Sequence, residues 1–251
     1  PSFQLSQYCD NCNTHLSHIC DNISFVSDIP LNKFPAPHVA VDVAVMTLVD
    51  NSLCVLLVQR TGDKSGSWAL PGRFVRERER LADTVAVALS EKCGLNSDVL
   101  DGRSPRQLHL FDDPDRDDRG WVMSAAHLIA LPFPLIAEVL ASRNDLRCVS
   151  VAEILNQQQP SVKLPYGQAE IVRYATSEMQ ELYRQFPDPE GLLIESPFTL
   201  AELRAVHIGV LGTDWQIDTF RRHMLPLLTD LDQLTIGRPG RPAALYSKPL
   251  Q

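Results

Sequence analysis

The sequence predicts an α+β protein with an N-terminal α/β/α sandwich and a C-terminal helix-turn-helix domain that carries a β-hairpin. Apolar, β-branched strands are separated by helices between residues 38 and 160, as in a sheet covered by helices. An amphipathic helix follows at 168–186, and the C-terminal residues then give the order helix, turn, helix, hairpin. We therefore expect a flexible leader at 1–37, the sandwich at 38–160, a connector helix and linker at 161–192, and the C-terminal domain at 193–251.

The composition is that of an ordinary globular protein. The 251 residues are 44% hydrophobic and 22% charged, and the net charge is -8. This charge argues against a protein that coats nucleic acid with a basic surface, but it is compatible with a small basic head on an acidic body. No apolar run is long enough to span a membrane, and the first residues lack a signal-peptide layout. We expect a cytoplasmic protein that does not bind membranes.

The cysteines and histidines near the start are weak candidates for zinc ligands. Thiolates and imidazoles bind zinc well, and the leader contains Cys9, Cys12, His15, His18 and Cys20. The spacing between these residues is much tighter than in a zinc finger, so a flexible leader without metal is the favoured interpretation. The remaining cysteines lie in apolar surroundings and are predicted to be reduced core residues.

A β-hairpin is predicted to open the sandwich. Residues 39–46 and 53–58 are apolar and rich in branched side chains, and Asp50-Asn51 between them is a turn signal. A helix at 81–92 has apolar residues at helical spacing, and Gly94 is placed to end it.

Shorter elements complete the predicted sandwich. Strands are expected at 107–111, 120–130 and 148–151, with an acidic loop at 112–118 between the first two and a short helix at 152–155 after the last.

The segment from the loop before Gly72 to the helix end at Gly94 has the outline of a Nudix box. In that motif a loop glycine and a glutamate precede a helix that reads Arg-Glu-apolar-x-Glu-Glu-x-Gly-apolar. Here Glu79 keeps the loop glutamate, and Glu91 keeps one glutamate of the helix. Four positions depart from the motif. Where the motif has Gly, Arg, Glu and Glu, this sequence has Arg73, Val87, Ala88 and Lys92, in that order. A working box uses a carboxylate cluster to hold Mg²⁺ against a diphosphate, so we expect no essential metal and no catalytic residues, with Glu79 and Glu91 as weak metal candidates.

The same region keeps side chains that suit a phosphate-bearing ligand with a base. Arginine forks match phosphate oxygens, and aromatic faces match a base or ribose. The alternative is that the tryptophans belong to the core and that some arginines are ordinary surface residues. The predicted ligand-binding residues are Arg60, Trp68, Arg73, Phe74, Glu77, Glu79, Arg119, Gly120 and Trp121.

The C-terminal residues predict a winged helix-turn-helix. Thr199 and Glu202 form a capping-box pattern for a first helix that stops near Gly212. Asp218 is the expected N-cap of a second helix at 219–225, which Pro226 should end or kink.

Strands at 231–236 and 244–247 then enclose a Gly-Arg-Pro turn that is the candidate wing. An ordinary charged helix and an ordinary hairpin are the alternative interpretation of these two features. The order of the elements favours DNA binding, with the early residues of the second helix facing base edges and the wing beside the backbone or in the minor groove. The predicted DNA-binding residues are Thr199, Thr219, Arg221, Arg222, His223, Arg238, Gly240 and Arg241.

Both halves together resemble the Nudix-related transcriptional regulators of NAD metabolism, the NrtR family. The resemblance rests on Leu-Leu-Val-Gln-Arg at 56–60, Trp-Ala-Leu-Pro-Gly at 68–72, Arg-Gly-Trp at 119–121, Thr-Phe-Arg-Arg at 219–222 and Gly-Arg-Pro at 240–242. It implies a Nudix-like sandwich followed by a winged helix. It also implies a homodimeric repressor that binds a palindromic double-stranded DNA operator near genes of NAD synthesis or salvage.

The resemblance further implies that ADP-ribose or a related NAD metabolite is the effector, with no required cofactor and Mg²⁺ not essential. Two alternatives stay open. One is a Mg²⁺-dependent ADP-ribose pyrophosphatase with an accessory C-terminal domain. The other is a Nudix-like interaction module whose wing contacts protein.

Overall fold

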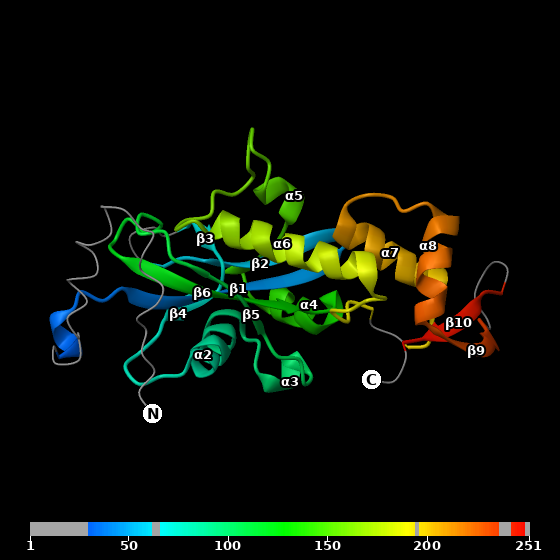
Figure 1. Cartoon of the computed structure of the whole chain (residues 1–251), viewed down its shortest axis with the longest axis horizontal. Helices are drawn as coiled ribbons and strands as arrows, with labels where there is room; N and C mark the ends of the chain where they lie inside the picture. Colours follow the sequence, from blue (N-terminus) through cyan, green and yellow to red (C-terminus); the bar gives the residue numbers. More distant parts are fainter. Residues whose placement is uncertain (1–29, 62–65, 194–195, 236–241, 249–251) are drawn as a thin grey trace, which may run out of the picture. The chain divides into compact units, whose positions relative to one another are not determined.

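A computed structural model describes residues 30–61, 66–193, 196–235 and 242–248 (Figure 1). By its contacts the chain divides into two compact units, Pro1–Ala36 and Pro37–Gln251. The first unit is described only in its last residues, which include the short 3-10 helix Leu31–Lys33. The candidate zinc ligands of the leader, Cys9, Cys12, His15, His18 and Cys20, lie outside the described residues.

The centre of the second unit is a mixed sheet of seven strands in the described part of the chain. Its main path runs β3-β2-β1-β6-β5, while β4 pairs with β1 and β7 pairs with β2. The β1–β6 pair is parallel and the other pairs are antiparallel. The strands are β1 (His38–Val49), β2 (Ser52–Gln59), β3 (Trp68–Ala69), β4 (Gly72–Phe74), β5 (Arg106–Phe111), β6 (Val122–Ala130) and β7 (Leu146–Ser150).

The predicted hairpin is the β1–β2 pair. Asp50 and Asn51 have φ angles of 49° and 58°, which are the left-handed conformations that a two-residue type I′ turn requires. The residues from Val41 to Thr47 are all buried, so this part of β1 lacks the alternation of a half-exposed strand. Helices cover both faces, which explains the nearly continuous apolar sequence.

One helical layer consists of α2 (Leu81–Cys93), the short α3 (Ser97–Leu100) and α4 (Phe133–Ser142), and the other of α5 (Val151–Ile154) and α6 (Gln168–Gln185). Figure 1 shows these two groups on opposite sides of the sheet. The predicted α/β/α sandwich is therefore confirmed. The helix α4 was not predicted, because two prolines near its start, Pro132 as its N-cap and Pro134 in its first turn, give the sequence the look of a loop.

Helix α6 has a role in the core that the sequence did not predict. The sequence predicted a connector, but Ile171, Val172, Ala175, Met179 and Tyr183 are fully buried in the core on one face of the sheet. Apolar periodicity shows that a helix has a buried side, but it does not show what covers that side. The helix is thus a layer of the sandwich as well as the link to the C-terminal domain.

The C-terminal domain is the predicted winged helix-turn-helix. Its elements are β8 (Phe198–Thr199), α7 (Leu200–Leu211), α8 (Ile217–Met224), a 3-10 turn (Leu225–Leu227), β9 (Thr229–Leu234) and β10 (Ala244–Ser247). The strands form a sheet in the order β8-β10-β9. The domain has its own small core of Phe198, Leu203, Phe220, Met224 and Tyr246.

Helix ends in this domain follow local sequence signals with one exception. The capping box is confirmed, since Thr199 Oγ1 accepts from Glu202 N at 3.2 Å and Glu202 Oε2 accepts from Thr199 N at 2.7 Å. The predicted N-cap Asp218 is wrong, because Gln216 Oε1 accepts from Thr219 N at 2.9 Å and α8 begins earlier. The amide side chain of Gln216 thus satisfies one of the orphan N–H groups at the start of α8.

The β1–β2 hairpin end packs tightly against α7. A Cβ atom added to Gly209 would lie 2.8 Å from Leu48 Cδ2 and 3.0 Å from Asn51 O. A glycine on α7 therefore allows close contact between the winged helix and the sandwich.

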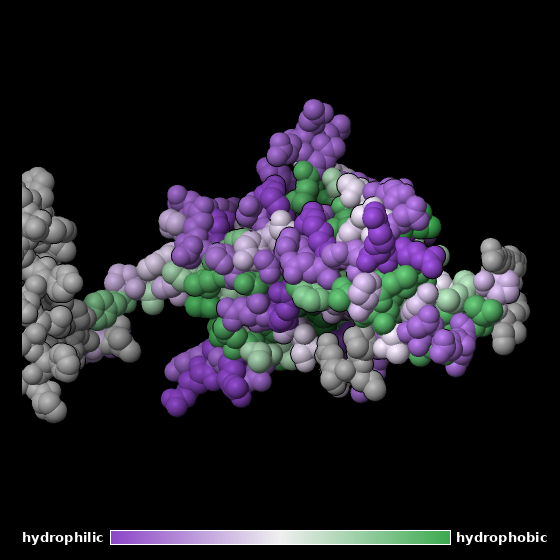
Figure 2. All heavy atoms as spheres, turned by 45° about the vertical axis from the view of Figure 1, so that its right-hand side comes forward, coloured by the Kyte–Doolittle hydropathy of each residue, from purple (hydrophilic) through white to green (hydrophobic). Residues whose placement is uncertain are grey.

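Hydrophilic residues cover much of the face in Figure 2, with apolar patches between them. In the described part of the chain, no helix combines the length and hydropathy needed to cross a membrane.

Candidate functional site

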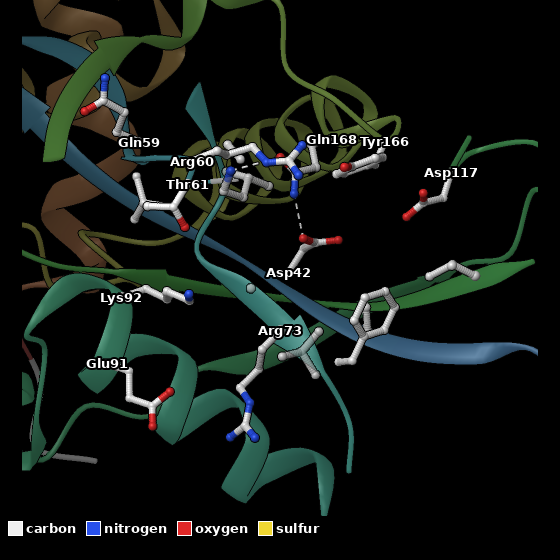
Figure 3. Close-up of a pocket in the computed structure, with 18 of the residues that line it drawn as sticks. Asp42, Gln59, Arg60, Thr61, Arg73, Glu91, Lys92, Asp117, Tyr166 and Gln168 are labelled. Atoms are coloured by element: carbon white, nitrogen blue, oxygen red, sulfur yellow. Dashed lines mark hydrogen bonds between the residues drawn. The ribbon is translucent and has the colours of Figure 1, made fainter. Parts of the chain in front are cut away.

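A polar cavity of the sandwich lies where β1, β2 and β4 meet the end of α2 and the loop before α6 (Figure 3). Its volume is about 480 Å³, which suits a small-molecule ligand. Its polar lining residues are Asp42, Gln59, Arg60, Thr61, Arg73, Glu91, Lys92, Arg116, Asp117, Arg119, Arg143, Asp145, Tyr166 and Gln168.

Asp42 forms the fixed floor of this pocket. It is 7% exposed, and its carboxylate accepts hydrogen bonds from Ser124 Oγ at 2.6 Å, Gln168 Nε2 at 2.6 Å and Arg116 Nη2 at 3.3 Å. Gln168 Oε1 in turn accepts from the backbone N–H of Leu70 at 2.9 Å. The first side chain of α6 is thus bonded both to the central strand β1 and to the Nudix loop.

One end of the pocket is built from arginines and aromatic rings. The guanidinium carbons of Arg60 and Arg119 lie 4.7 Å and 4.2 Å from the centre of the Tyr166 ring, within the range of cation–π contacts. Arg119 also lies 5.3 Å from the Phe74 ring centre. Within the described residues Arg60 Nη1 is buried without a hydrogen-bond partner, which leaves a donor for a ligand.

Arg119 is held in place by Asp117. Arg119 Nε and Nη2 donate to the two carboxylate oxygens at 2.9 Å and 2.7 Å, a bidentate pair. This hydrogen bonding lowers the pKa of Asp117 below its ordinary value, so the carboxylate stays charged at neutral pH. The pair fixes the guanidinium against the aromatic rings.

Arg73 is turned toward the Nudix glutamate. Its Nη1 donates to Glu79 Oε1 at 3.1 Å, and Arg76 N donates to Glu79 Oε2 at 2.9 Å. In Figure 3 the Arg73 side chain points away from Asp42. The bond from the Arg76 backbone, aided by the Arg73 charge, lowers the pKa of Glu79. The carboxylate that a Nudix enzyme offers to a metal is therefore engaged by a guanidinium of the same chain.

The described residues do not fit a metal centre. Among them, no group of three or more His, Cys, Asp or Glu side chains is arranged to hold an ion. Glu91 lines the pocket, but Lys92 beside it extends into the same space (Figure 3). An ammonium group next to a single carboxylate opposes a divalent cation. No step of a metal-assisted reaction follows from this arrangement.

The structure brings together part of the predicted ligand set. Arg60, Arg73, Phe74 and Arg119 line the pocket, whereas Trp68, Glu77, Glu79, Gly120 and Trp121 do not. The Trp68 ring is covered by Arg147, whose guanidinium carbon lies 4.2 Å from the ring centre. Trp121 is 43% exposed.

Sequence reasoning missed several pocket residues. Asp42 carries a usable signal, because an acidic residue inside a buried apolar strand requires a partner. Arg116, Tyr166 and Gln168 carry no comparable signal. They reach the pocket only because the acidic loop and the start of α6 fold over β1.

The candidate DNA interface is the outer side of α8. Phe220 and Met224 are fully buried, while Thr219, Arg221 and Arg222 are exposed. The exposed ring of His223 lies 5.5 Å from that of Trp215, measured between ring centres. Within the described part of the chain, neither arginine of α8 has an ion-pair partner. These predicted residues therefore share one accessible surface.

Two predictions for the winged helix end differently. Thr199 is 7% exposed and its hydroxyl is occupied by the capping box, so its side chain has a structural role, and the DNA contact there stays a prediction. The hydroxyl satisfies the start of α7. Arg238, Gly240 and Arg241 of the candidate wing lie outside the described residues.

Comparisons with known proteins agree with this architecture. Residues 192–247 match the model of the NrtR DNA-binding winged helix domain. An ADPR responsive transcriptional repressor from Acinetobacter baylyi is 27% identical over 234 residues, which is 91% of this chain and 88% of the relative. The crystal structure of Shewanella oneidensis NrtR complexed with a 27mer DNA has a TM-score of 0.67 and 29% identity, and the match covers 84% of this chain and 93% of that chain.

A shorter match concerns an enzyme. The ADP-ribose pyrophosphatase of Methanocaldococcus jannaschii is 32% identical over 88 residues, which is 35% of this chain and 49% of that protein. The matches to regulators extend over both domains, so the resemblance to the NrtR family is confirmed.

Proposed function

We propose that this chain, a Nudix-like sandwich joined to an NrtR-type winged helix, is a DNA-binding transcriptional repressor controlled by ADP-ribose or a related NAD metabolite. The observation that carries the proposal is a cation-rich pocket, with no metal-binding cluster among the described residues, in the same chain as an exposed pair of arginines on a winged-helix surface. The Acinetobacter relative named for its response to ADPR and the Shewanella relative bound to DNA support it. In this proposal the protein acts in the cytoplasm as a homodimer on a palindromic operator near genes of NAD synthesis or salvage.

The pocket suits an elongated ligand with a diphosphate. Tyr166 and Phe74 offer aromatic faces to a base, and Arg60, whose guanidinium lies over the Tyr166 ring, has a buried donor without a partner among the described residues. Arg60 and Lys92 are the cations that we assign to the phosphates, since charge-assisted hydrogen bonds to phosphate are strong. Arg73 has a smaller role in binding than the sequence predicted, because its guanidinium is committed to Glu79.

The same ion pair supports the absence of catalysis. A metal-dependent diphosphatase needs several free carboxylates at the scissile bond, and here the loop carboxylate is bonded while the helix has Ala88 and Lys92 at two cluster positions. Hydrolysis of ADP-ribose is the second candidate function, favoured only by the partial match to the Methanocaldococcus enzyme. In our proposal the ligand is bound and not cleaved.

On the DNA side, α8 enters the major groove. The exposed early residues Thr219, Arg221 and Arg222 face base edges and phosphates in this arrangement. Arg238 and Arg241 of the predicted wing are proposed to contact the backbone or minor groove, as the Gly- and Pro-rich sequence around them suggests.

The test measures three properties of one preparation. Fluorescence anisotropy with a duplex from upstream of the protein's own operon should show salt-dependent binding, and ADP-ribose should change the operator Kd. Release of AMP is followed in parallel with Mg²⁺ present. We expect DNA binding and an ADP-ribose effect without turnover. Turnover without DNA binding would establish the pyrophosphatase instead, and indifference to duplex DNA at low salt would reject the repressor.

A further inference from the structure

Helix α6 extends from the ligand pocket to the winged helix. Its first residue, Gln168, is 3% exposed and bonded to Asp42 in the pocket floor. Near its other end, Tyr183 is fully buried against the C-terminal domain. Eighteen residues of α-helix span about 27 Å at the usual rise per residue. A single rigid element therefore contacts both functional regions.

A buried carboxylate accepts a hydrogen bond from the C-terminal end of this helix. Asp188 is fully buried, and its side chain accepts from Tyr183 Oη at 2.8 Å, Leu192 N at 2.7 Å and Leu193 N at 3.2 Å. Lys248 directly follows β10, and its Nζ donates to Asp188 Oδ2 at 3.2 Å and to the Asp188 carbonyl oxygen at 3.1 Å. One side chain thus joins α6, the segment that enters the winged helix and the end of the wing sheet. We name this cluster of Tyr183, Asp188 and Lys248 the Asp188 joint.

His207 connects the joint to the DNA-facing helix. The Asp188 N–H donates to His207 Nε2 at 3.5 Å, and the imidazole ring centre lies 5.1 Å from both the Tyr183 and the Phe220 ring centres in edge-on packing. Phe220 is the buried anchor of α8. Helix α8 therefore packs, through Phe220, against the His207 ring, which also contacts Tyr183 in the last turns of α6.

We propose that the Asp188 joint is the output end of α6 and that the Asp42–Gln168 contact is its input end, so that occupation of the pocket is transmitted to α8. This inference rests on the proposed function. A ligand shifts the protein between two arrangements only if it binds them with different affinity. Gln168 supplies that difference, because its amide belongs to the pocket lining and to the helix that moves.

The joint has the chemistry of an element with discrete states. Asp188 is fully buried, so its carboxylate keeps an unsatisfied acceptor if it loses either the half-exposed Lys248 ammonium or the buried Tyr183 hydroxyl, and partial opening is therefore unfavourable. The winged helix is expected to be held in a defined orientation or released from it as a unit. A surface ion pair would permit gradual movement instead.

The experiment measures coupling in the full chain. Tyr183→Phe removes only the hydroxyl, and Lys248→Met keeps the length of the side chain without its charge. Tyr174→Phe is the matched control, because it removes a hydroxyl from the same helix at a residue that is 36% exposed. For each protein the operator Kd is measured with and without saturating ADP-ribose, and the ratio of the two values is the coupling factor.

We expect a native coupling factor of about 5 to 150, the usual range for allosteric proteins. Both joint variants should bring this factor close to 1. Their affinity for the operator without ADP-ribose, and their affinity for ADP-ribose without DNA, should stay within about threefold of the native values. Tyr174→Phe should keep the native factor. Hydrogen exchange of residues 217–224 is the second readout, and ADP-ribose should alter it in the native protein but not in the joint variants. Native coupling in both joint variants, with native thermal unfolding, would overturn the inference. Absence of DNA or ADP-ribose binding in the native protein would reject the proposed function itself.

Discussion

Replacing Asp42 by alanine tests whether the pocket floor is a structural network as well as a binding surface. The substitution removes an acceptor used by three side chains and leaves the Arg116 guanidinium, whose side chain is 5% exposed, as a buried charge without its carboxylate. Breaking a buried pair by removing one partner costs about 3–5 kcal/mol. A chain of this size loses about 2–4 °C in Tm for each kcal/mol, so we expect a drop of about 6–20 °C.

The assay is urea unfolding of the native protein, Asp42→Ala, Arg116→Met and the double variant. If the charge of Arg116 causes most of the loss, the double variant should be more stable than Asp42→Ala by about 1–3 kcal/mol, in the manner of a double-mutant cycle. The reasoning is refuted if Asp42→Ala changes the free energy of unfolding by less than about 0.5 kcal/mol, the range of ordinary surface substitutions. It is also refuted if Arg116→Met gives no rescue.

Three further predictions concern DNA contact, metal and pH. Arg221→Ala should weaken operator binding and reduce the slope of log K against log salt by about 1, while Arg184→Ala on the surface of α6 should leave both unchanged in anisotropy titrations. Arg73→Gly should free the Nudix glutamate without creating Mn²⁺ binding, because Ala88 and Lys92 still occupy two positions of the carboxylate cluster, and Mn²⁺ binding detected by calorimetry would contradict the view that the cluster is lost. Burial lowers the pKa of His207 from 6.5 to about 4, so the unfolded chain binds more protons between these values. The contribution of neutral His207 to the free energy of unfolding should therefore be fully present above pH 6.5 and fall by on the order of 3 kcal/mol as pH drops toward 4. His207→Leu should lose this pH dependence in urea titrations.

Local signals predicted much of the fold. The Asp50-Asn51 turn, the Gly94 helix end and the Thr199 capping box depend on residues close together in sequence, and all three are present in the structure. Pro226 follows the end of α8 and lies in a 3-10 turn, as its missing N–H requires. These features can be predicted because the interacting groups are neighbours in the chain.

The pocket was harder to predict because its contacts are distant in sequence. Asp42 meets Arg116, Ser124 and Gln168 across separations of 74, 82 and 126 residues. Arg73 lines the pocket, but sequence spacing could not show that its guanidinium turns to Glu79. Residue type and spacing identified the region and its charge, whereas the pairing of those charges required the fold.

The close contact of Gly209 with the β1–β2 hairpin has a mechanical consequence. Strand β1 contains Asp42 in the pocket and Leu48 beside α7, so it is a second rigid element, besides α6, that connects the pocket to the winged helix. Because both β1 and α6 contact the winged helix, a hinge rotation about either element is resisted by the other. A sliding motion of the winged helix along them is still allowed. The motion expected between ligand states is therefore a shear of α7 along the hairpin end rather than a hinge opening. Pulsed spin-label distances between the sandwich and α7 would separate these motions, because a shear changes distances along the hairpin while a hinge changes those across it.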